Sequence, residues 1–307
     1  MTGVPDRFRV SAQVSEARAA GQPIVALETT LVTHGLPHPE GLSVAAELEA
    51  EVRSAGATPA TLGVLDGFLV AGLTPAELER LATAPRVAKV NLSNLAACLA
   101  SAGPGSTTVA ATVFASHRLG IRVLATGGIG GVHRDAGETG DVSSDLTALA
   151  RFPVAVVCAG AKAVLDLPKT VEALETLGVP VFGWQTDRLP AFYRRDSGLP
   201  VDRRFDTLPE LSGAVAAHLD LGLGTGVVVG NPIPPDHEMP AELYERSLAE
   251  ALRDAAARGV RGRDVTPFLL ERLRVLTEGR SVFSNRALLR ANAALAGRLA
   301  KALAVSR

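Results

Sequence analysis

Lys162 is the residue of this chain whose surroundings most favour covalent chemistry. The sequence reads "VVCAGAKAVLDLPKT" over residues 156–170, so the lysine follows an apolar run and a turn of small residues. Apolar neighbours would partly desolvate its ammonium group and favour the neutral amine, a nucleophile that forms an imine with a carbonyl carbon or a sugar C1′. Because most lysines are solvated surface charges, an ordinary surface role is the competing interpretation.

Two more polar side chains directly follow apolar runs. Glu28 comes after "IVAL", in a segment that continues to His34, and Thr126 comes after "RVLA". In open α/β sheets, ligands bind beyond the carboxyl ends of the strands, so these positions are the first candidates for a site. A carboxyl group beside an amine nucleophile is a candidate general acid or base, and this is the chemistry that we expect of Glu28.

A glycine-rich stretch, "GGIGGVHR", spans residues 127–134. It does not match a dinucleotide-binding loop, because His133 stands where the third glycine should be and no helical pattern follows at once. Backbone amides between glycines can form an anion-binding concavity, and His133 and Arg134 are suitable partners for a phosphate. A plain turn is the competing interpretation.

The segment "DVSSDL" supplies a second candidate anion site. Ser143 or Ser144, together with Asp145, can cap the helix that follows, which is the structural interpretation. A helix N-terminus also favours an anion through its free N–H groups and its dipole. Asp141 just upstream could hold a hard divalent cation through oxygen, with water completing the coordination. A nucleophilic lysine, a carboxyl group and a phosphate site describe a Schiff-base enzyme acting on a sugar phosphate.

The elements that must position these residues alternate along the chain. Apolar, β-branched runs bounded by Gly or Pro are candidate strands: "IVALETTLV", "ATLGVLDGFLV", "RVAKVNL", "IRVLATGG", "PVAVVCAGA", "VPVFGW" and "TGVVVGNP". Helical patterns lie between them: "LSVAAELEAEVRSAG", "TPAELERLA", "STTVAATVFASHRLG", "VSSDLTALARF" and "KTVEALETLG". In the second of these, Thr74, Pro75 and Glu77 form a capping box with proline at the first helical position.

This alternation predicts a three-layer α/β/α fold with a largely parallel or mixed central sheet. Three amphipathic patterns close the sequence, "PAELYERSLAEALRDAAARG", "VTPFLLERLRVLTEG" and "NRALLRANAALAGRLAKALA", and predict a C-terminal helical cap packed on the sheet. Residues 187–209 are expected to form a long ordered loop. We interpret residues 1–307 as a single domain.

Composition narrows the class of partner. The 307 residues include 31 Lys and Arg against 32 Asp and Glu, and 4% are aromatic, which argues against binding to nucleic acid or to an anionic membrane. No stretch approaches the length of a membrane span and no signal peptide is apparent. Cys98 and Cys158 lie in apolar contexts without metal-ligand spacing, which fits a reducing cytoplasm. A small-molecule ligand is expected.

With these residues in view, the chain resembles the pseudouridine-5′-phosphate glycosidase family, also called indigoidine synthase A-like. The resemblance runs from about Val25 to the C-terminus and is carried by "ALETTLVTHGLPHP", "PATLGVLDG", "STTVAAT", "ATGGIGGVHR", "DVSSDL", the stretch from "VVCAGAK" to "AFY", "NPIP" and "VTPFLL". It implies a carbon–oxygen lyase that reversibly cleaves the C–C glycosidic bond of pseudouridine 5′-phosphate to uracil and ribose 5-phosphate.

The resemblance also implies roles for single residues. Lys162 matches the family's nucleophile, which attacks C1′ and opens the ribose ring to an imine, and Glu28 matches its proton donor. Asp141 matches the aspartate that holds Mn²⁺, one ion per subunit. The matching substrate-binding positions are Lys89, Val109 through its backbone, Thr126, His133, Ser143, Ser144, Asp145 and Asn285. The family is further expected to form a homotrimer.

The segment after Lys89 departs from the family pattern. Relatives usually continue with a Ser-Arg-Asp or Arg-Arg-Asp run, whereas this chain reads "VNLSNL". We expect Ser93 or Asn94 to supply the contact that the change removes.

Two other functions stay open at the level of the sequence. An aldolase-like Schiff-base enzyme would keep Lys162 and a phosphate site but would need no pocket for uracil around Thr126 and Asn285. A ligand-binding homologue without catalysis would use Lys162 only to pair with a phosphate.

Overall fold

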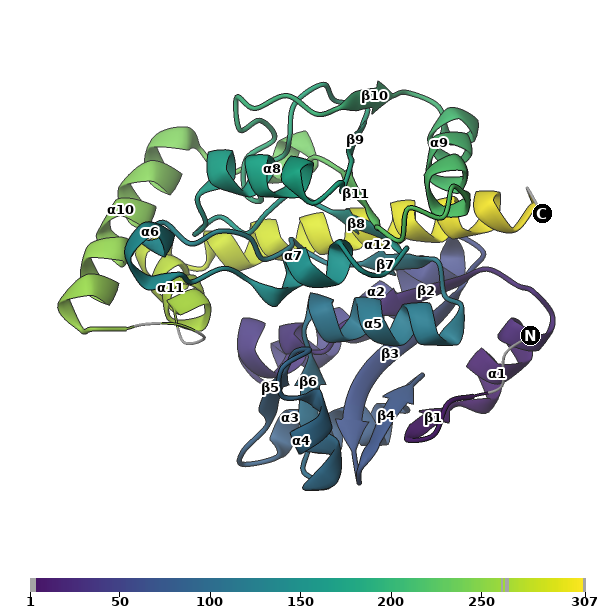
Figure 1. Ribbon diagram of the computed structural model, residues 1–307. Helices are drawn as coiled ribbons and strands as arrows, with labels where there is room; N and C mark the ends of the chain where they lie inside the picture. The colour runs from purple at the N-terminus through teal and green to yellow at the C-terminus, as the bar shows by residue number, and fades with distance from the viewer. Residues whose placement is uncertain (1–3, 261, 263–264, 306–307) are drawn as a thin grey trace.

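The fold is built on one mixed β-sheet. The computed structural model describes residues 4–260, 262 and 265–305, and Figure 1 shows their arrangement. In this part of the chain the sheet has 11 strands, with the order β1-β4-β3-β2-β7-β8-β11-β9-β10; off this path, β6 pairs with β3 and β5 pairs with β6. The strands are β1 (Phe8–Val10), β2 (Ile24–Leu27), β3 (Thr58–Leu65), β4 (Phe68–Ala71), β5 (Ala88–Val90), β6 (Gly105–Thr107), β7 (Val123–Ala125), β8 (Ala155–Cys158), β9 (Val181–Trp184), β10 (Arg203–Phe205) and β11 (Val227–Gly230).

The centre of the sheet is parallel, as predicted. Strand β7 pairs in parallel with β2 on one side and with β8 on the other, and β8 continues in parallel to β11. Every residue of these four strands is buried, which explains why the sequence reads as continuous apolar runs and not as alternating ones. Because the strands are parallel, the residues that follow them meet at one edge of the sheet.

A hairpin makes the sheet mixed. The run "ATLGVLDGFLV", predicted as one strand, covers most of β3 and most of β4, and the two strands are antiparallel. Asp66 and Gly67 connect them with φ values of 55° and 81°, the left-handed backbone that an Asp-Gly hairpin turn requires. Strand β6 also pairs with β3 in the antiparallel sense.

Helices cover the sheet on two sides. The helices are α1 (Ala12–Ala19), α2 (Glu40–Ser54), α3 (Pro75–Thr83), α4 (Leu95–Ala100), α5 (Val109–Leu119), α6 (Ala136–Thr139), α7 (Ser144–Leu149), α8 (Leu167–Thr176), α9 (Leu208–Asp220), α10 (Ala241–Ala257), α11 (Val265–Leu276) and α12 (Arg280–Val305). Figure 1 shows α5 and α7 in front of the central strands and α12 behind them. The α/β class with its mixed sheet is therefore as predicted.

The helix starts follow their capping signals. Thr74 and Glu77 form the predicted capping box at α3, and Thr108 caps α5 by accepting a hydrogen bond from the Ala111 N–H. A π-helical turn, η1 (Leu31–Gly35), follows β2, and a 3₁₀ turn, η2 (Pro235–His237), follows β11. Neither turn has a signal in the hydrophobic pattern.

The C-terminal helices do more than cap the sheet. Helix α12 packs against α2, β2, β7 and β8, and its apolar side is part of the main core. Figure 1 shows this helix crossing the width of the molecule. Helices α10 and α11 pack on each other at one end, beyond the central strands. Burial of a full face of α12 makes it a structural layer of the fold, not a peripheral addition.

Some short elements escaped sequence analysis. Gly105–Thr107 is the strand β6, although we assigned Ser106 and Thr107 to the helix that begins only at Val109. The expected loop at 187–209 contains β10 and the start of α9. Cys98 and Cys158 are both buried free thiols. Among the described residues, no helix is long and apolar enough to cross a membrane.

Candidate active site

Glu28 is held rigidly at the carboxyl end of β2. Its Oε2 accepts hydrogen bonds from the Leu31 N–H at 3.1 Å and from the Thr30 hydroxyl. Its Oε1 accepts a hydrogen bond from the Thr126 hydroxyl, which follows β7, at 3.4 Å. The side chain is half-buried. The parallel pairing of β2 and β7 thus brings together two polar residues that lie far apart in the sequence.

Lys162 lies in a turn after β8 and before α8. Its N–H donates to the Ile129 carbonyl at 3.0 Å, and its carbonyl accepts from the Leu165 N–H at 3.1 Å. The Tyr244 hydroxyl donates to the next carbonyl, that of Ala163, at 3.0 Å. Burial raises the pKa of Tyr244 to about 12, so the hydroxyl keeps the proton that it donates. The backbone beside the half-buried lysine is therefore fixed from two sides.

Glu28 and Lys162 line the same cavity, which we call the leucine pocket. Its apolar walls are Leu31, Phe192, Pro267, Leu270 and Leu289, and its polar lining includes Glu28, His34, Lys89, Thr126, Lys162, Thr266 and Asn285. A cavity with apolar walls and a few polar groups suits a partly polar ligand. Besides Lys162, four substrate-binding or catalytic candidates from the sequence line this pocket: Glu28, Lys89, Thr126 and Asn285.

Asn285 stands out among the residues of the leucine pocket. The residue is 7% exposed, and in the described part of the chain its Oδ1 has no hydrogen-bond partner. A buried acceptor without a partner costs free energy, so this atom is a strong candidate to bind a donor group of a ligand.

Asn292 lies on α12, the helix that also carries Asn285, and it supports the site although the sequence analysis did not single it out. Its Nδ2 donates to the Thr126 carbonyl at 2.8 Å, and its Oδ1 accepts from Asn231 at 2.9 Å. These bonds are buried and connect α12 to the loops that follow β7 and β11. Asn292 therefore fixes the backbone of Thr126, whose hydroxyl reaches Glu28.

A second cavity, the serine pocket, adjoins the first. It is lined by Lys89, Asn91, Thr108, Gly130, His133, Asp141, Val142, Ser143, Ser144, Asp145, Lys162, Leu165, Gly262 and Thr266. Lys89, Lys162 and Thr266 line both cavities. The amine of Lys162 therefore belongs to the junction between an apolar slot and a polar one.

Asp141 and His133 meet in the serine pocket. The His133 N–H donates to the Asp141 carbonyl at 3.1 Å, and the ring Nδ1 lies 3.8 Å from a carboxylate oxygen of Asp141. His133 is buried, whereas the Asp141 side chain is 28% exposed. Within the described residues, no group of three or more His, Cys, Asp or Glu side chains gathers around a possible ion. The pocket thus offers a metal one accessible carboxylate.

The "DVSSDL" segment caps a helix, which is the structural interpretation given for it from the sequence. Ser143 caps α7, since its hydroxyl accepts from the Asp145 N–H at 3.2 Å. The Asp145 carboxylate is buried and accepts from the N–H groups of Ala110 and Gly130, each at 2.8 Å. Ser143 and Ser144 still line the serine pocket, and spare lone pairs on Asp145 could accept from a ligand hydroxyl.

Val109 is the first residue of α5, and its side chain is buried, with 1% exposure. Any contact with a ligand would use its backbone N–H, which belongs to the first turn of the helix. Its neighbour Thr108 lines the serine pocket.

The glycine-rich stretch does not present a row of free amides. The N–H groups of Ile129, Gly130, Val132 and His133 each donate to an acceptor within the protein. The glycines are needed for close packing: a Cβ on Gly130 would lie 2.6 Å from the Ser143 Cβ. The anion-binding concavity that we considered is therefore not formed by these four amides.

The "VNLSNL" segment contributes a residue other than the two expected. Asn94 uses its side chain on the Asn91 N–H and the Lys89 carbonyl, and the exposed Ser93 hydroxyl donates to the Asn91 Oδ1 at 2.7 Å. Asn91 is the member of this group that lines the serine pocket. Ser93 and Asn94 thus shape the turn beside Lys89.

These features define an α/β protein with a lysine and a glutamate in one pocket at the carboxyl edge of a parallel sheet, and with an aspartate and serines in the next. The chain matches the Indigoidine synthase A like protein family over residues 13–302, and it belongs to that family.

Relatives of known name cover almost the whole chain. The pseudouridine-5′-phosphate glycosidase of Jannaschia sp. (strain CCS1) is 53% identical over 293 residues, which are 95% of this chain and 97% of the relative. The enzyme of that name from Geobacillus kaustophilus (strain HTA426) is 47% identical, over 95% of this chain and 97% of its own.

Solved structures agree with the fold. The crystal structure of the prealnumycin C-glycosynthase AlnA in complex with ribulose 5-phosphate has a TM-score of 0.91 and 38% identity, and the match covers 98% of this chain and 99% of that one. An indigoidine synthase A-like protein from Thermotoga maritima has a TM-score of 0.89 and 34% identity, with 99% of each chain covered.

Proposed function

We propose that this protein catalyses the reversible cleavage of the C–C glycosidic bond of pseudouridine 5′-phosphate, giving uracil and ribose 5-phosphate. The observation that carries the proposal is the position of Lys162 between the leucine pocket and the serine pocket. A ligand with a flat base at one end and a phosphate at the other would present its sugar C1′ to the amine. The names of the relatives, at about half identity over nearly the full chain, support the same reaction.

The lysine makes an otherwise difficult bond cleavage possible. Uracil attached through carbon is a poor leaving group, so direct displacement is slow. The Lys162 amine attacks C1′, the bond from C1′ to the ring oxygen breaks, and that oxygen takes up a proton. A proton is then delivered to C5 of uracil, the C–C bond breaks, and its electron pair stays with the base. Lys162 is left as an imine of ribose 5-phosphate, which water hydrolyses to free the amine and the sugar.

Glu28 is the proposed proton donor. It lines the same pocket as Lys162, and its two oxygens are oriented by the hydroxyls of Thr30 and Thr126 and by the Leu31 N–H. A carboxyl group fixed in this way can protonate the departing ring oxygen or the base carbon without first losing side-chain freedom.

The base and the phosphate have separate partners in this proposal. The Asn285 Oδ1, which has no hydrogen-bond partner among the described residues, would accept a hydrogen bond from an N–H group of uracil, between the apolar walls of the leucine pocket. Lys89, His133, Ser143 and Ser144 line the serine pocket, where ammonium, imidazole and hydroxyl groups suit a phosphate. Thr126, Asp145 and the backbone of Val109 complete the proposed set through the contacts described above.

We further propose that Asp141 holds a Mn²⁺ ion. The Asp141 carboxylate is partly exposed and the Asp145 carboxylate already accepts from two backbone N–H groups, so Asp141 is the carboxylate offered to an ion. This donor set fits a hard divalent cation that keeps most of its waters. Such an ion would supply positive charge near the phosphate.

The test is to incubate the protein with pseudouridine 5′-phosphate and Mn²⁺ and to follow free uracil. Borohydride reduction in the presence of ribose 5-phosphate is expected to trap a covalent adduct on Lys162. An adduct without uracil release would favour another Schiff-base lyase or an aldolase. Absence of both would leave only the ligand-binding alternative.

We also propose that the enzyme acts as a homotrimer in the cytoplasm. The family resemblance supports the assembly, and the two free thiols are compatible with a reducing compartment. Light scattering coupled to size exclusion measures the assembly directly, and a mass other than three chains would contradict it.

A further inference from the structure

His34 has no role in the function proposed so far, yet it lies on the same turn as Leu31, whose N–H donates to Glu28. That turn is η1 (Leu31–Gly35). π-Helical turns are rare and occur often at functional sites, because the wider turn redirects side chains. The histidine is half-buried and lines the leucine pocket together with Glu28 and Asn285.

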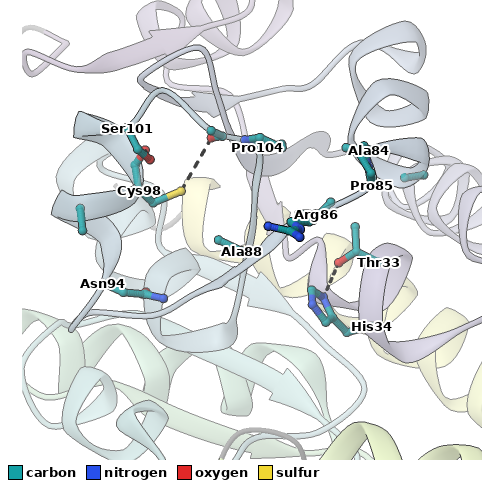
Figure 2. A pocket seen from close by; sticks show the side chains of 14 residues that line it. Thr33, His34, Ala84, Pro85, Arg86, Ala88, Asn94, Cys98, Ser101 and Pro104 are labelled. Carbon is teal, nitrogen blue, oxygen red and sulfur yellow. Dashed lines mark hydrogen bonds between the residues drawn. The ribbon is translucent and has the colours of Figure 1, made fainter.

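The imidazole ring is held by two hydroxyl groups at one nitrogen. Its Nδ1 lies 2.6 Å from Thr33 Oγ1 and 3.2 Å from Ser106 Oγ, and Ser106 is fully buried. Figure 2 shows the ring beside Thr33, with the hydrogen bond dashed. Two hydroxyls at Nδ1 fix the plane of the ring, so Nε2 is presented in a fixed direction on the other side. This is how proteins prepare an imidazole nitrogen for a specific partner.

The surroundings of His34 keep the ring neutral. Burial and, to a smaller extent, the nearby Lys89 ammonium lower the pKa of His34 from its ordinary value of 6.5. A neutral imidazole offers one nitrogen as a donor and the other as an acceptor, and it adds no charge to a pocket with apolar walls. It therefore suits an uncharged polar group such as an amide-like N–H or carbonyl.

The position of His34 favours the base over the sugar phosphate. His34 and Asn285 both line the leucine pocket and a second, larger cavity beside it, whereas Lys89 and Lys162 line the leucine pocket and the serine pocket. Uracil linked through C5 carries two N–H groups and two carbonyl groups. One asparagine amide cannot satisfy all four, so the base needs at least one further polar partner in the pocket.

We propose that His34 is a specificity-determining residue that hydrogen-bonds the pyrimidine base through Nε2. The proposal rests on the proposed function, because it takes uracil as the occupant of the leucine pocket. The ring would select a base with a complementary polar edge, because an analogue without it would leave a buried nitrogen unpaired.

The experiment measures the reverse reaction, in which uracil and ribose 5-phosphate are varied separately. His34→Leu is expected to raise the KM for uracil by about 10- to 100-fold, the range for losing a hydrogen bond to a buried polar group, and to leave the KM for ribose 5-phosphate within about twofold. His34→Gln, which keeps a polar side chain of suitable length, is expected to lie between the wild type and His34→Leu, and it carries the test if the leucine variant fails to fold. His117→Gln, a change of an exposed histidine on α5, is the matched control and should alter neither constant.

Borohydride trapping with ribose 5-phosphate alone distinguishes a failure of the proposed function from a failure of the proposed role of His34. His34→Leu should form the Lys162 adduct as the wild type does, because imine formation needs no base. No adduct and no uracil turnover in the wild type would reject the proposed function itself. An active wild type with an unchanged KM for uracil in His34→Leu would overturn the role of His34 alone. An equal rise in both KM values would also overturn it, since a general distortion of the pocket would explain that result.

Discussion

The carboxylate of Asp145 accepts a hydrogen bond from the N–H of Gly130 at 2.8 Å, and this contact ties the start of α7 to the glycine-rich loop. The other carboxylate oxygen accepts from the Ala110 N–H at the start of α5. One buried side chain thus joins three segments that line the serine pocket. Asp145 therefore stabilises the structure of the site, whether or not it also contacts a ligand.

Replacing Asp145 with Ala should therefore destabilise the fold. The change leaves two buried N–H groups without acceptors, at a cost of about 2–4 kcal/mol in the free energy of unfolding. Denaturant titration measures this quantity. Asp236→Asn, at an exposed position, is the control and should change stability by less than about 0.5 kcal/mol. A stable Asp145→Ala protein would mean that water replaces the carboxylate.

Loss of the Lys162 amine should abolish turnover without unfolding the protein. Lys162→Ala removes the only group proposed to form the imine, so uracil release and borohydride trapping should both fall below detection. Its unfolding temperature should stay within about 2 °C, because the side chain is half-buried and the turn is held by backbone bonds. Lys169→Ala, at an exposed lysine of α8, should keep full activity. Near-native rates in Lys162→Ala would exclude the covalent mechanism.

The fold was largely predictable because burial leaves a strong pattern. Strands such as Ala155–Cys158 are apolar at every position and end in small residues, so both the parallel sheet and the edge that carries Lys162 followed from the sequence. Three-residue strands such as Gly105–Thr107 are too short for any period to appear. The Asp-Gly pair at 66–67 did carry a hairpin signal, which the apolar run around it obscured.

Reasoning from the strand pattern alone could predict only residues that follow a strand closely. Glu28 and Thr126, directly after β2 and β7, and Lys162, four residues beyond the end of β8, met that condition. Asn292 did not, since it lies within a long helix and reaches Thr126 only through the packing of α12 on the sheet. It stands seven residues, about two turns, after Asn285, and polar residues at that spacing on an apolar helix face are the signal that could have revealed it.

Glu28→Gln should lower the rate by about 100- to 10,000-fold, the usual contribution of a general acid. The amide has the same shape and keeps an oxygen that can accept from the Leu31 N–H, so the turn should survive. Single-turnover rates of uracil release measure the effect. Glu175→Gln, at an exposed glutamate of α8, serves as the control. A loss of less than about tenfold would indicate that Glu28 only positions its neighbours.

Asp141→Asn should lower the affinity of the enzyme for Mn²⁺. The neutral amide is a poor ligand for a hard cation, so the Mn²⁺ concentration for half-maximal activity should rise by at least about 10-fold. Glu138→Gln changes an exposed carboxylate nearby and should leave that concentration unchanged. Equal manganese dependence in the two variants would exclude Asp141 as the ligand, and activity that persists in chelator would remove the need for a metal.

Burial should protect the thiols of Cys98 and Cys158 from modification, and burial of Cys158 should also make the stability of the fold depend on pH. Burial raises the pKa of Cys98 above its ordinary value of 9.0 and that of Cys158 to about 12. Since the thiolate is the reactive form, a disulfide reagent at pH 8 should label neither thiol quickly until denaturant is added.

The unfolded chain releases the Cys158 proton near pH 9, while the folded chain keeps it until about pH 12. Stability from this group is therefore complete below pH 9 and declines as the pH rises between these values, so a Cys158→Ala variant should show a flatter alkaline limb in unfolding titrations. Rapid labelling of the native protein would contradict the burial of both thiols, and an unchanged alkaline limb in the variant would assign that limb to other groups.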